Sequence, residues 1–421
     1  MSTTVSDTGP GPVSAGAGAA AAVTAQPPAG PGRSRPHVRA FDLVRLIIMA
    51  FVVGVHTLAL GGGQVTVALG AITTVFHTSR ELFFLLTALV LTYNYGHRER
   101  VRWLGFWRRR YWLIVPGYVA WTAIYYAFDG SGRGPFPGAL ARDLLDAGAR
   151  YHLYFLLVTM QVYLLFPVLR WVLRKTAGHH LALFAAACAY QLALTVALQH
   201  DLVRTGPLAE WLNGAGLGIW LDSYVLYVVG GAIAGWHFER ICAFTRRHAS
   251  ARTVTLAAGF GVAAGLGAYL AQVYAGGATP AAASAVFQPV VVVEALAFGW
   301  ALLAAGLLWS DRGAPHRKFF AAGAASSFGI YLAHPLVLQG LLLAAGTGGV
   351  LAAVRSGPAP LEVLALLGVA VPVVYGASWL IASAARRTPL SLMLTGREYG
   401  AGRRGRAHGG KELQAGLCGG S

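Results

Sequence analysis

Long runs of apolar residues, separated by short polar segments, make up most of the chain. A helix needs about 20 predominantly apolar residues to cross the hydrocarbon core of a bilayer. The pattern therefore predicts an all-α, polytopic membrane bundle of about ten transmembrane helices. A membrane β-barrel would instead need short strands of alternating polarity, which are lacking. We place the spans at 41–60, 70–96, 111–128, 151–172, 181–199, 219–238, 253–275, 286–310, 324–345 and 360–384. The second run is interrupted by Arg80 and Glu81, which leaves Leu82–Tyr95 as a shorter alternative for that span.

Basic residues are distributed unevenly between the segments that connect these runs. Most of the 33 Lys and Arg residues fall in alternate segments, beginning with the one before the first run. The other connecting segments hold only Arg133, Arg142, Arg150, Arg204 and Arg355. Because Lys and Arg favour the cytoplasmic side, we expect both ends of the chain to be cytoplasmic and the protein to be multi-pass in the cell (cytoplasmic) membrane.

Composition supports a membrane protein and bounds its domains. The 421 residues are 56% hydrophobic and 12% charged, whereas soluble domains carry about 25% charged residues. A net charge of +17 would suit nucleic acid, but membrane topology already explains the basic residues, so we expect no nucleic-acid partner. We predict a disordered cytoplasmic tail at 1–38, a transmembrane domain at 39–385, and a basic, flexible cytoplasmic tail at 386–421.

Ionisable side chains inside a predicted span are functional candidates, because charge is costly in the bilayer. In the first span, Asp42 and Arg45 are three residues apart and share a helix face. His56 follows Arg45 by eleven residues, which places it on roughly the same side and about 16 Å further along the helix. An imidazole is a natural general base near neutral pH. The alternative is that Asp42 pairs with Arg45 and that His56 is a packing residue.

Two arginine-containing segments suggest polar or anionic ligands. Arg80 and Glu81 are adjacent and do not face each other on a helix, so we expect each to need a separate partner or a wet cavity; if a helix begins there, both are interfacial. Arg108, Arg109 and Arg110 lie where the third span begins. Guanidinium groups bind phosphate bidentately, so this run could hold coenzyme A phosphates. The alternative is that it only anchors the helix.

Further candidates lie in the fourth and ninth spans. His152 opens the fourth span among aromatic residues and Gln161 follows it; an ordinary interfacial histidine is the alternative reading. Tyr331 and His334 share a face of the ninth span, and Pro335 should free a backbone carbonyl there. Neither residue need do chemistry if both bond only within the bundle. No metal-ligand spacing, GxSxG motif or P-loop is found, so we expect no metal and no permanently bound cofactor.

Taken together, these segments resemble the acyltransferase 3 family of integral membrane acyltransferases, over about residues 40–385. The resemblance rests on five segments: Phe41-Asp42-Leu43-Val44-Arg45 with His56, Leu82–Ala88, Phe106–Tyr111, His152–Pro167, and Ser327–Pro335. The family's Arg-x-x-Arg lacks its second arginine here, because Leu113 stands at that position. The pattern is closest to the branch that modifies surface polysaccharides, typified by intercellular adhesin succinyltransferase-like proteins.

The resemblance implies transfer of an acetyl- or succinyl-like group from cytoplasmic acyl-CoA, most simply acetyl-CoA, to a hydroxyl of a glycan or a lipid-linked or small-molecule acceptor. His56 would act as the base or carry the acyl group transiently, supported by Asp42, Arg45, Arg80 and Glu81. Arg108–Arg110 would bind coenzyme A, and Tyr331, His334, His152 and Gln161 would face the acceptor. A glycan or lipid transporter, a structural subunit and a homo-oligomer remain open alternatives at this stage.

Overall fold

The computed structural model describes residues 36–62, 64–129, 136–203, 205–208, 210 and 217–399. Every regular element in these ranges is a helix, as the sequence predicts. Most of the two predicted tails, including residues 1–35 and 400–421, lies outside the described residues.

Eight helical segments within the described residues are long and apolar enough to cross a membrane, so the chain is a multi-pass membrane protein. They are α1 (Ala40–Gly61), α2 (Val67–Tyr95), α5 (Tyr154–Lys175), α6 (His180–Gln199), α10 (Ala251–Leu270) with the π-helical turn η2 (Ala271–Ala275), α12 (Pro289–Asp311), α13 (Arg317–Thr347), and α15 (Ala359–Val363) continuing through the π-helical η3 (Leu364–Ala370) into α16 (Val371–Ala385).

The other two predicted spans correspond to helices that do not meet these criteria. The first, α3 (Trp103–Asp129), is long, but its apolar part is rich in Tyr and Trp and follows three arginines. The second consists of the short 3-10 turn η1 (Leu221–Tyr224) and α8 (Val225–Trp236), which together are shorter than a full span. The shorter helices are α4 (Phe136–Asp146), α9 (Phe238–His248), α11 (Pro280–Ala283), α14 (Val350–Ser356) and α17 (Ser391–Thr395).

Helix α2 runs unbroken over 29 residues, so the shorter alternative Leu82–Tyr95 is wrong. Its N-terminus is capped by Thr66, whose hydroxyl accepts a hydrogen bond from the Leu69 amide at 3.2 Å. Arg80 and Glu81 therefore lie in the middle of the helix, away from either end. The burial of Glu81, which is 1% exposed, excludes the interfacial alternative for that residue.

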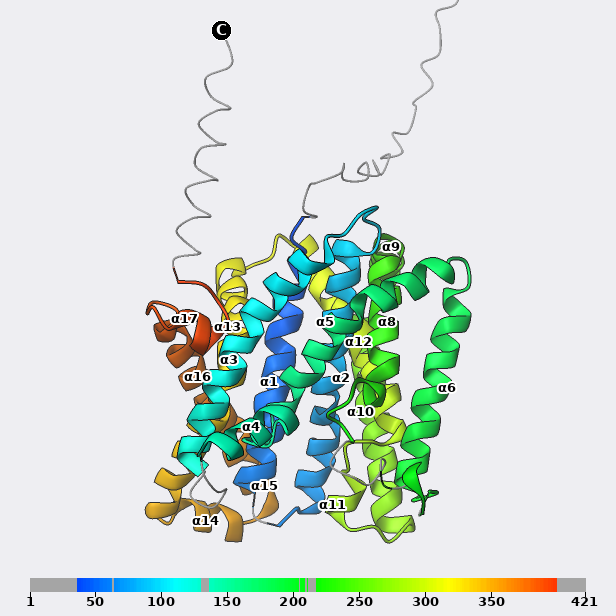
Figure 1. The fold of residues 1–421 in the computed structure, drawn as a ribbon. Helices are drawn as coiled ribbons and strands as arrows, with labels where there is room; N and C mark the ends of the chain where they lie inside the picture. Colours follow the sequence, from blue (N-terminus) through cyan, green and yellow to red (C-terminus); the bar gives the residue numbers. More distant parts are fainter. Residues whose placement is uncertain are drawn as a thin grey trace, which may run out of the picture. The chain divides into compact units, whose positions relative to one another are not determined.

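Helices α1 and α2 pass through the middle of the bundle, and α6 lies at one edge (Figure 1). Small residues let α8 approach α2 closely. A Cβ at Gly231 would lie 2.1 Å from the Leu85 carbonyl oxygen, and one at Gly235 would lie 2.4 Å from that of Leu89. Two glycines four residues apart form the small-xxx-small pattern that brings membrane helices together. This contact sets the close spacing between α2 and α8.

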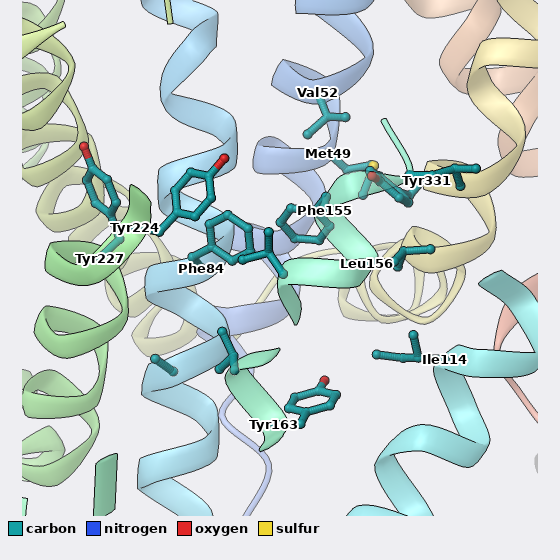
Figure 2. Packing of buried hydrophobic residues seen from close by; sticks show 14 of the residues in the cluster. Met49, Val52, Phe84, Ile114, Phe155, Leu156, Tyr163, Tyr224, Tyr227 and Tyr331 are labelled. Carbon is teal, nitrogen blue, oxygen red and sulfur yellow. The ribbon is translucent and has the colours of Figure 1, made fainter. Parts of the chain in front are cut away.

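The centre of the bundle is filled by aromatic rings from several helices (Figure 2). Phe84 of α2 stacks on Phe155 of α5 at 4.7 Å between centroids and contacts Tyr224 of η1 at 4.5 Å. Phe155 in turn contacts Tyr331 of α13 at 5.4 Å. This row of rings joins four elements that are distant in sequence.

The two ends differ in character. We call the end that carries α9 and Arg108–Arg110 the basic end, and the end that carries α11, α14 and α15 the cavity end; Figure 1 shows them at the top and bottom. At the basic end, Arg246 of α9 donates from Nε to Asp311 Oδ2 at 2.9 Å, which ties α9 to the last turn of α12.

Candidate active site

A cavity of 1080 Å³ lies toward the cavity end, between α1, α2, the start of α5 and the segment that precedes α12. Its volume suits an organic substrate, because ligand sites usually enclose about 300–1,000 Å³. Its walls are mostly apolar, with a few polar side chains that converge on the interior. The polar and aromatic residues that line it include His56, His77, Arg80, Tyr151, His152, Tyr154, Gln272, Phe287, Gln288 and Tyr331.

Three histidines from three separate parts of the chain meet beside this cavity. The ring of His56 on α1 stacks on that of His334 on α13, with 5.3 Å between centroids. His152, just before α5, packs edge-on against His334 at 5.4 Å. Tyr151 covers another side of His56 at 4.6 Å. The structure therefore brings together three of the histidine candidates that the sequence analysis singled out.

Pro335 determines which nitrogen of His334 carries its proton. Proline lacks an N–H, so the carbonyl of Tyr331, four residues earlier, loses its helical partner. His334 Nδ1 lies 2.7 Å from that carbonyl oxygen, which can only accept, so Nδ1 must be the donor. Its Nε2 is then an unprotonated acceptor, buried and with no hydrogen-bond partner among the described residues.

His152 is buried, and Tyr331 binds its backbone carbonyl. The side chain is 1% exposed, and neither ring nitrogen has a hydrogen-bond partner in the described part of the chain. The Tyr331 hydroxyl donates to the His152 carbonyl oxygen. The interfacial alternative for His152 is therefore wrong: packing from Tyr125 of α3 and from α13 buries the ring, which its place among aromatic residues did not reveal.

Arg80 and Glu81 pair directly, so the expectation of separate partners is wrong. Arg80 Nε donates to Glu81 Oε1 at 2.9 Å, and one terminal nitrogen donates to the same oxygen. The two long side chains bend toward each other, although the Cα–Cβ bonds of adjacent helical residues point in different directions. The guanidinium also lies over the rings of Phe287 and Tyr224, at 4.4 and 4.9 Å from their centroids. Arg80 thus presents a fixed positive charge to the cavity.

Two ionisable residues near this site were missed by the sequence analysis. His77 lines the cavity three residues before Arg80, on the same face of α2. The three-residue spacing between His77 and Arg80 was the sequence feature that could have identified His77.

Glu294 of α12 is fully buried, and neither carboxylate oxygen has a hydrogen-bond partner among the described residues. It packs against Gly265 of α10, where a Cβ would lie 1.9 Å from Glu294 Oε1. A single acidic residue in an otherwise apolar run was the signal for it.

The remaining candidates gather at the basic end. Asp42 Oδ2 lies 2.8 Å from His37 Nε2. Arg45 of α1 is within electrostatic range of Asp42 and Arg110. Arg397, which follows α17, is within electrostatic range of Arg45, Asp42 and Arg386. The first and last parts of the described chain thus contribute guanidinium groups to one cluster.

The three consecutive arginines point in different directions. Arg110 turns inward and lies 5.5 Å from the centroid of the Tyr163 ring and 5.8 Å from that of Phe106. Arg108 and Arg109 are exposed, and Arg109 Nε donates to the Gly105 carbonyl at 3.2 Å. Successive helical residues point about 100° apart, so only one of the three reaches the cluster around Arg45.

Gln161 is used structurally. Its Nε2 donates to the Ile219 carbonyl at 2.7 Å, and its Oε1 accepts from the Leu221 amide at 2.9 Å. Both ends of the amide are therefore occupied in holding the segment before η1, which lines one wall of the cavity.

Within the described residues, no group of three or more His, Cys, Asp or Glu side chains has the geometry to hold a metal ion. The arrangement instead offers three imidazoles beside a cavity, with guanidinium groups both inside it and at the opposite end.

Comparison with known proteins agrees with the resemblance seen in the sequence. No curated protein and no solved structure matches the chain. Residues 38–379 match the model of a family described as an acyltransferase domain, which covers α1 to most of α16. The match spans most of the chain and includes every histidine around the cavity, and the chain therefore belongs to the acyltransferase 3 family of integral membrane acyltransferases.

Proposed function

We propose that this protein transfers an acyl group, most simply acetyl, from acyl-CoA to a hydroxyl of a glycan or lipid-linked acceptor. The observation that carries the proposal is the position of His56. Its ring stacks between His334 and Tyr151 at the wall of a substrate-sized cavity. The same helix reaches the arginine cluster at the basic end.

The donor is proposed to bind at the basic end, which faces the cytoplasm. Arg45, Arg110, Arg386 and Arg397 supply permanent positive charges there, and guanidinium groups suit the phosphates of coenzyme A. Arg45 and His56 are separated by eleven residues of α1, or about 16 Å. The extended pantetheine arm would bridge that separation and present the thioester to His56.

The acceptor is proposed to occupy the cavity. Tyr151, Tyr154 and Phe287 provide flat apolar surfaces, and Gln272, whose Nε2 donates to Gln288 Oε1 at 2.8 Å, provides an amide oxygen. A sugar has both apolar ring faces and hydroxyls, so it would match this lining. Access from the cavity end would allow an acceptor from the outer side of the membrane to enter.

In the proposed reaction the acceptor hydroxyl oxygen attacks the thioester carbonyl carbon. His56 removes the hydroxyl proton as the C–O bond forms. The C–S bond breaks, and the leaving thiolate receives that proton, so free coenzyme A and an ester are the products. Arg80 lines the same cavity and would stabilise the negative charge that develops on the carbonyl oxygen.

The test is release of coenzyme A thiol from acetyl-CoA by the purified protein, with a panel of saccharides and a membrane lipid extract as acceptors. We expect His56→Ala to lower the rate by about 10²–10⁴-fold. His248→Ala is the matched control, because His248 is exposed on α9 at the other end. A wild-type protein that neither binds nor consumes acetyl-CoA would overturn the proposal and favour a transporter.

A further inference from the structure

A second cavity, unrelated to the histidine cluster, lies on the other side of α2. It encloses 660 Å³ and is bounded by α1, α2, α6, α8 and α12. Its walls are apolar over most of their length, with Leu82, Leu86 and Phe184 among the lining residues. We call it the α6 groove, because α6 forms its outer edge and turns most of its own surface outward, with Leu181 82% exposed.

The polar side chains of the α6 groove are concentrated at its basic end. His180, His237 and Arg240 all line that end. His180 Nε2 lies 2.8 Å from the Leu173 carbonyl and therefore donates to it, which leaves Nδ1 as an acceptor. His237 Nε2 lies 2.7 Å from that Nδ1 and donates in turn. The chain of bonds fixes both rings, while Arg240 is exposed and has no ion-pair partner within the described residues.

The length of the groove matches one leaflet. Its lining extends along α8 from Leu226 to His237, eleven residues or about 16 Å. The hydrocarbon core of a bilayer is about 30 Å thick, so the groove covers about half of it. With its cationic end at the level of the lipid headgroups, a groove of this length would extend its apolar part toward the mid-plane.

We propose that the α6 groove binds one anionic phospholipid, with its phosphate against Arg240 and an acyl chain along α2 and α8. An apolar groove that ends at an arginine without an ion-pair partner is complementary to a negatively charged headgroup on a hydrocarbon chain. The site is distinct from the substrate cavity, so it does not depend on the proposed function. Because α8 forms a wall of this groove and packs closely on α2, bound lipid would stabilise the helix pair that also carries Arg80.

The experiment uses the full-length protein, purified in detergent and stripped of lipid. Phosphatidylglycerol and phosphatidylcholine of the same chain length are titrated separately, and thermal stability and bound lipid by native mass spectrometry are measured. We expect phosphatidylglycerol to bind more tightly and to raise the melting temperature more. Arg240→Gln should weaken phosphatidylglycerol binding by about fivefold, the effect of one arginine near an anionic lipid surface, and should leave phosphatidylcholine binding unchanged.

Two further variants make the result specific. Arg247→Gln is the charge-matched control, because Arg247 is exposed on the same helix but does not line the groove. Gly299→Leu should fill the groove and reduce binding of both lipids; a Cβ at Gly299 meets Leu82 and Leu85 only at ordinary contact distances of 3.6 and 3.7 Å. Equal binding of the two lipids by wild type, or equal effects of Arg240→Gln and Arg247→Gln, would overturn the proposal.

Discussion

His334 takes up the carbonyl of Tyr331 that Pro335 leaves without a helical partner, with 2.7 Å between Nδ1 and the oxygen. Pro335 thus leaves a backbone carbonyl free, and the neighbouring His334 side chain donates to it. This hydrogen bond fixes the imidazole tautomer. A fixed, neutral His334 gives His56 a constant stacking partner at the cavity wall. We interpret His334 as a positioning residue for His56.

Pro335→Ala should test whether the fixed tautomer of His334 matters for turnover while helix α13 is kept. The new N–H would compete for the Tyr331 carbonyl and release His334 Nδ1, so we expect the turnover number to fall at least about tenfold, a barrier increase of ~1.4 kcal/mol. The fold should be retained, because alanine favours a helix more than proline does. Pro167→Ala in α5 is the control, because Pro167 is also inside a helix but the carbonyl that it frees, that of Tyr163, accepts from Trp107 Nε1 at 2.9 Å. A variant with unchanged kinetics and pH profile would show that the tautomer does not matter.

The contact between Glu294 and Gly265 predicts a strong steric effect at an apparently simple glycine. A methyl group at Gly265 would overlap the Glu294 carboxylate, since the closest approach is 1.9 Å. Overpacking in a core typically costs about 1–3 kcal/mol, so Gly265→Ala should lower thermal stability clearly. Gly267→Ala in the same helix should be almost neutral, because a Cβ there meets nothing within 4 Å.

A double variant tests whether that contact is the cause. Glu294→Ala removes the carboxylate, so Gly265→Ala should cost much less in that background. If the double variant loses as much stability as the sum of the two single variants, the two side chains are not coupled as the structure implies.

The three arginines at the start of α3 should differ in their effects on acetyl-CoA binding. Only Arg110 turns inward toward Arg45, so Arg110→Ala should weaken binding more than Arg108→Ala or Arg109→Ala. Loss of one charged hydrogen bond to phosphate is worth about 1.5–3 kcal/mol, or about 10- to 150-fold in the dissociation constant. Isothermal titration at low and high salt measures this. Equal effects of the three variants would instead support a diffuse basic surface.

Cys242 on α9 should be chemically inert in the folded protein. Burial, chiefly, raises its thiol pKa to about 11, and Asp311 and Glu239 add to the rise although Arg246 opposes it. Since the thiolate is the reactive form, the reaction should be slow: about one in 10³ Cys242 side chains is ionised at pH 8, against about one in four for a free cysteine of pKa about 8.5. Alkylation should rise with pH toward 11 and become fast on unfolding.

The measurement uses iodoacetamide on a Cys188→Ser/Cys418→Ser background, which leaves Cys242 as the single thiol. Mass spectrometry of native and SDS-unfolded samples gives the two rates. Rapid labelling of the native protein at pH 8 would mean that α9 does not pack on the bundle as described.

Much of the membrane architecture followed from the sequence alone. The length of an apolar run is a local property, and it decides by itself whether a helix can cross the hydrocarbon core. The spans of α1, α2, α5, α6, α10 and α12 were placed within a few residues of the helices observed, whereas α13 begins at Arg317, well before the predicted start at 324. The family resemblance was also local, since it rests on short segments in a fixed order. The two weaker spans, α3 and α8, show the limit: aromatic content and short length make hydropathy a poor guide there.

Which polar residues meet was decided only by the tertiary structure. His56, His152 and His334 are far apart in the sequence, and only the packing of α13 and the start of α5 against α1 brings their rings together. The pairing of Arg80 with Glu81 depends on side-chain rotamers and on the rings above the guanidinium. A sequence pattern fixes the face of a helix that a side chain occupies, but the neighbours across that face come from long-range packing, and these determine what the side chain can do.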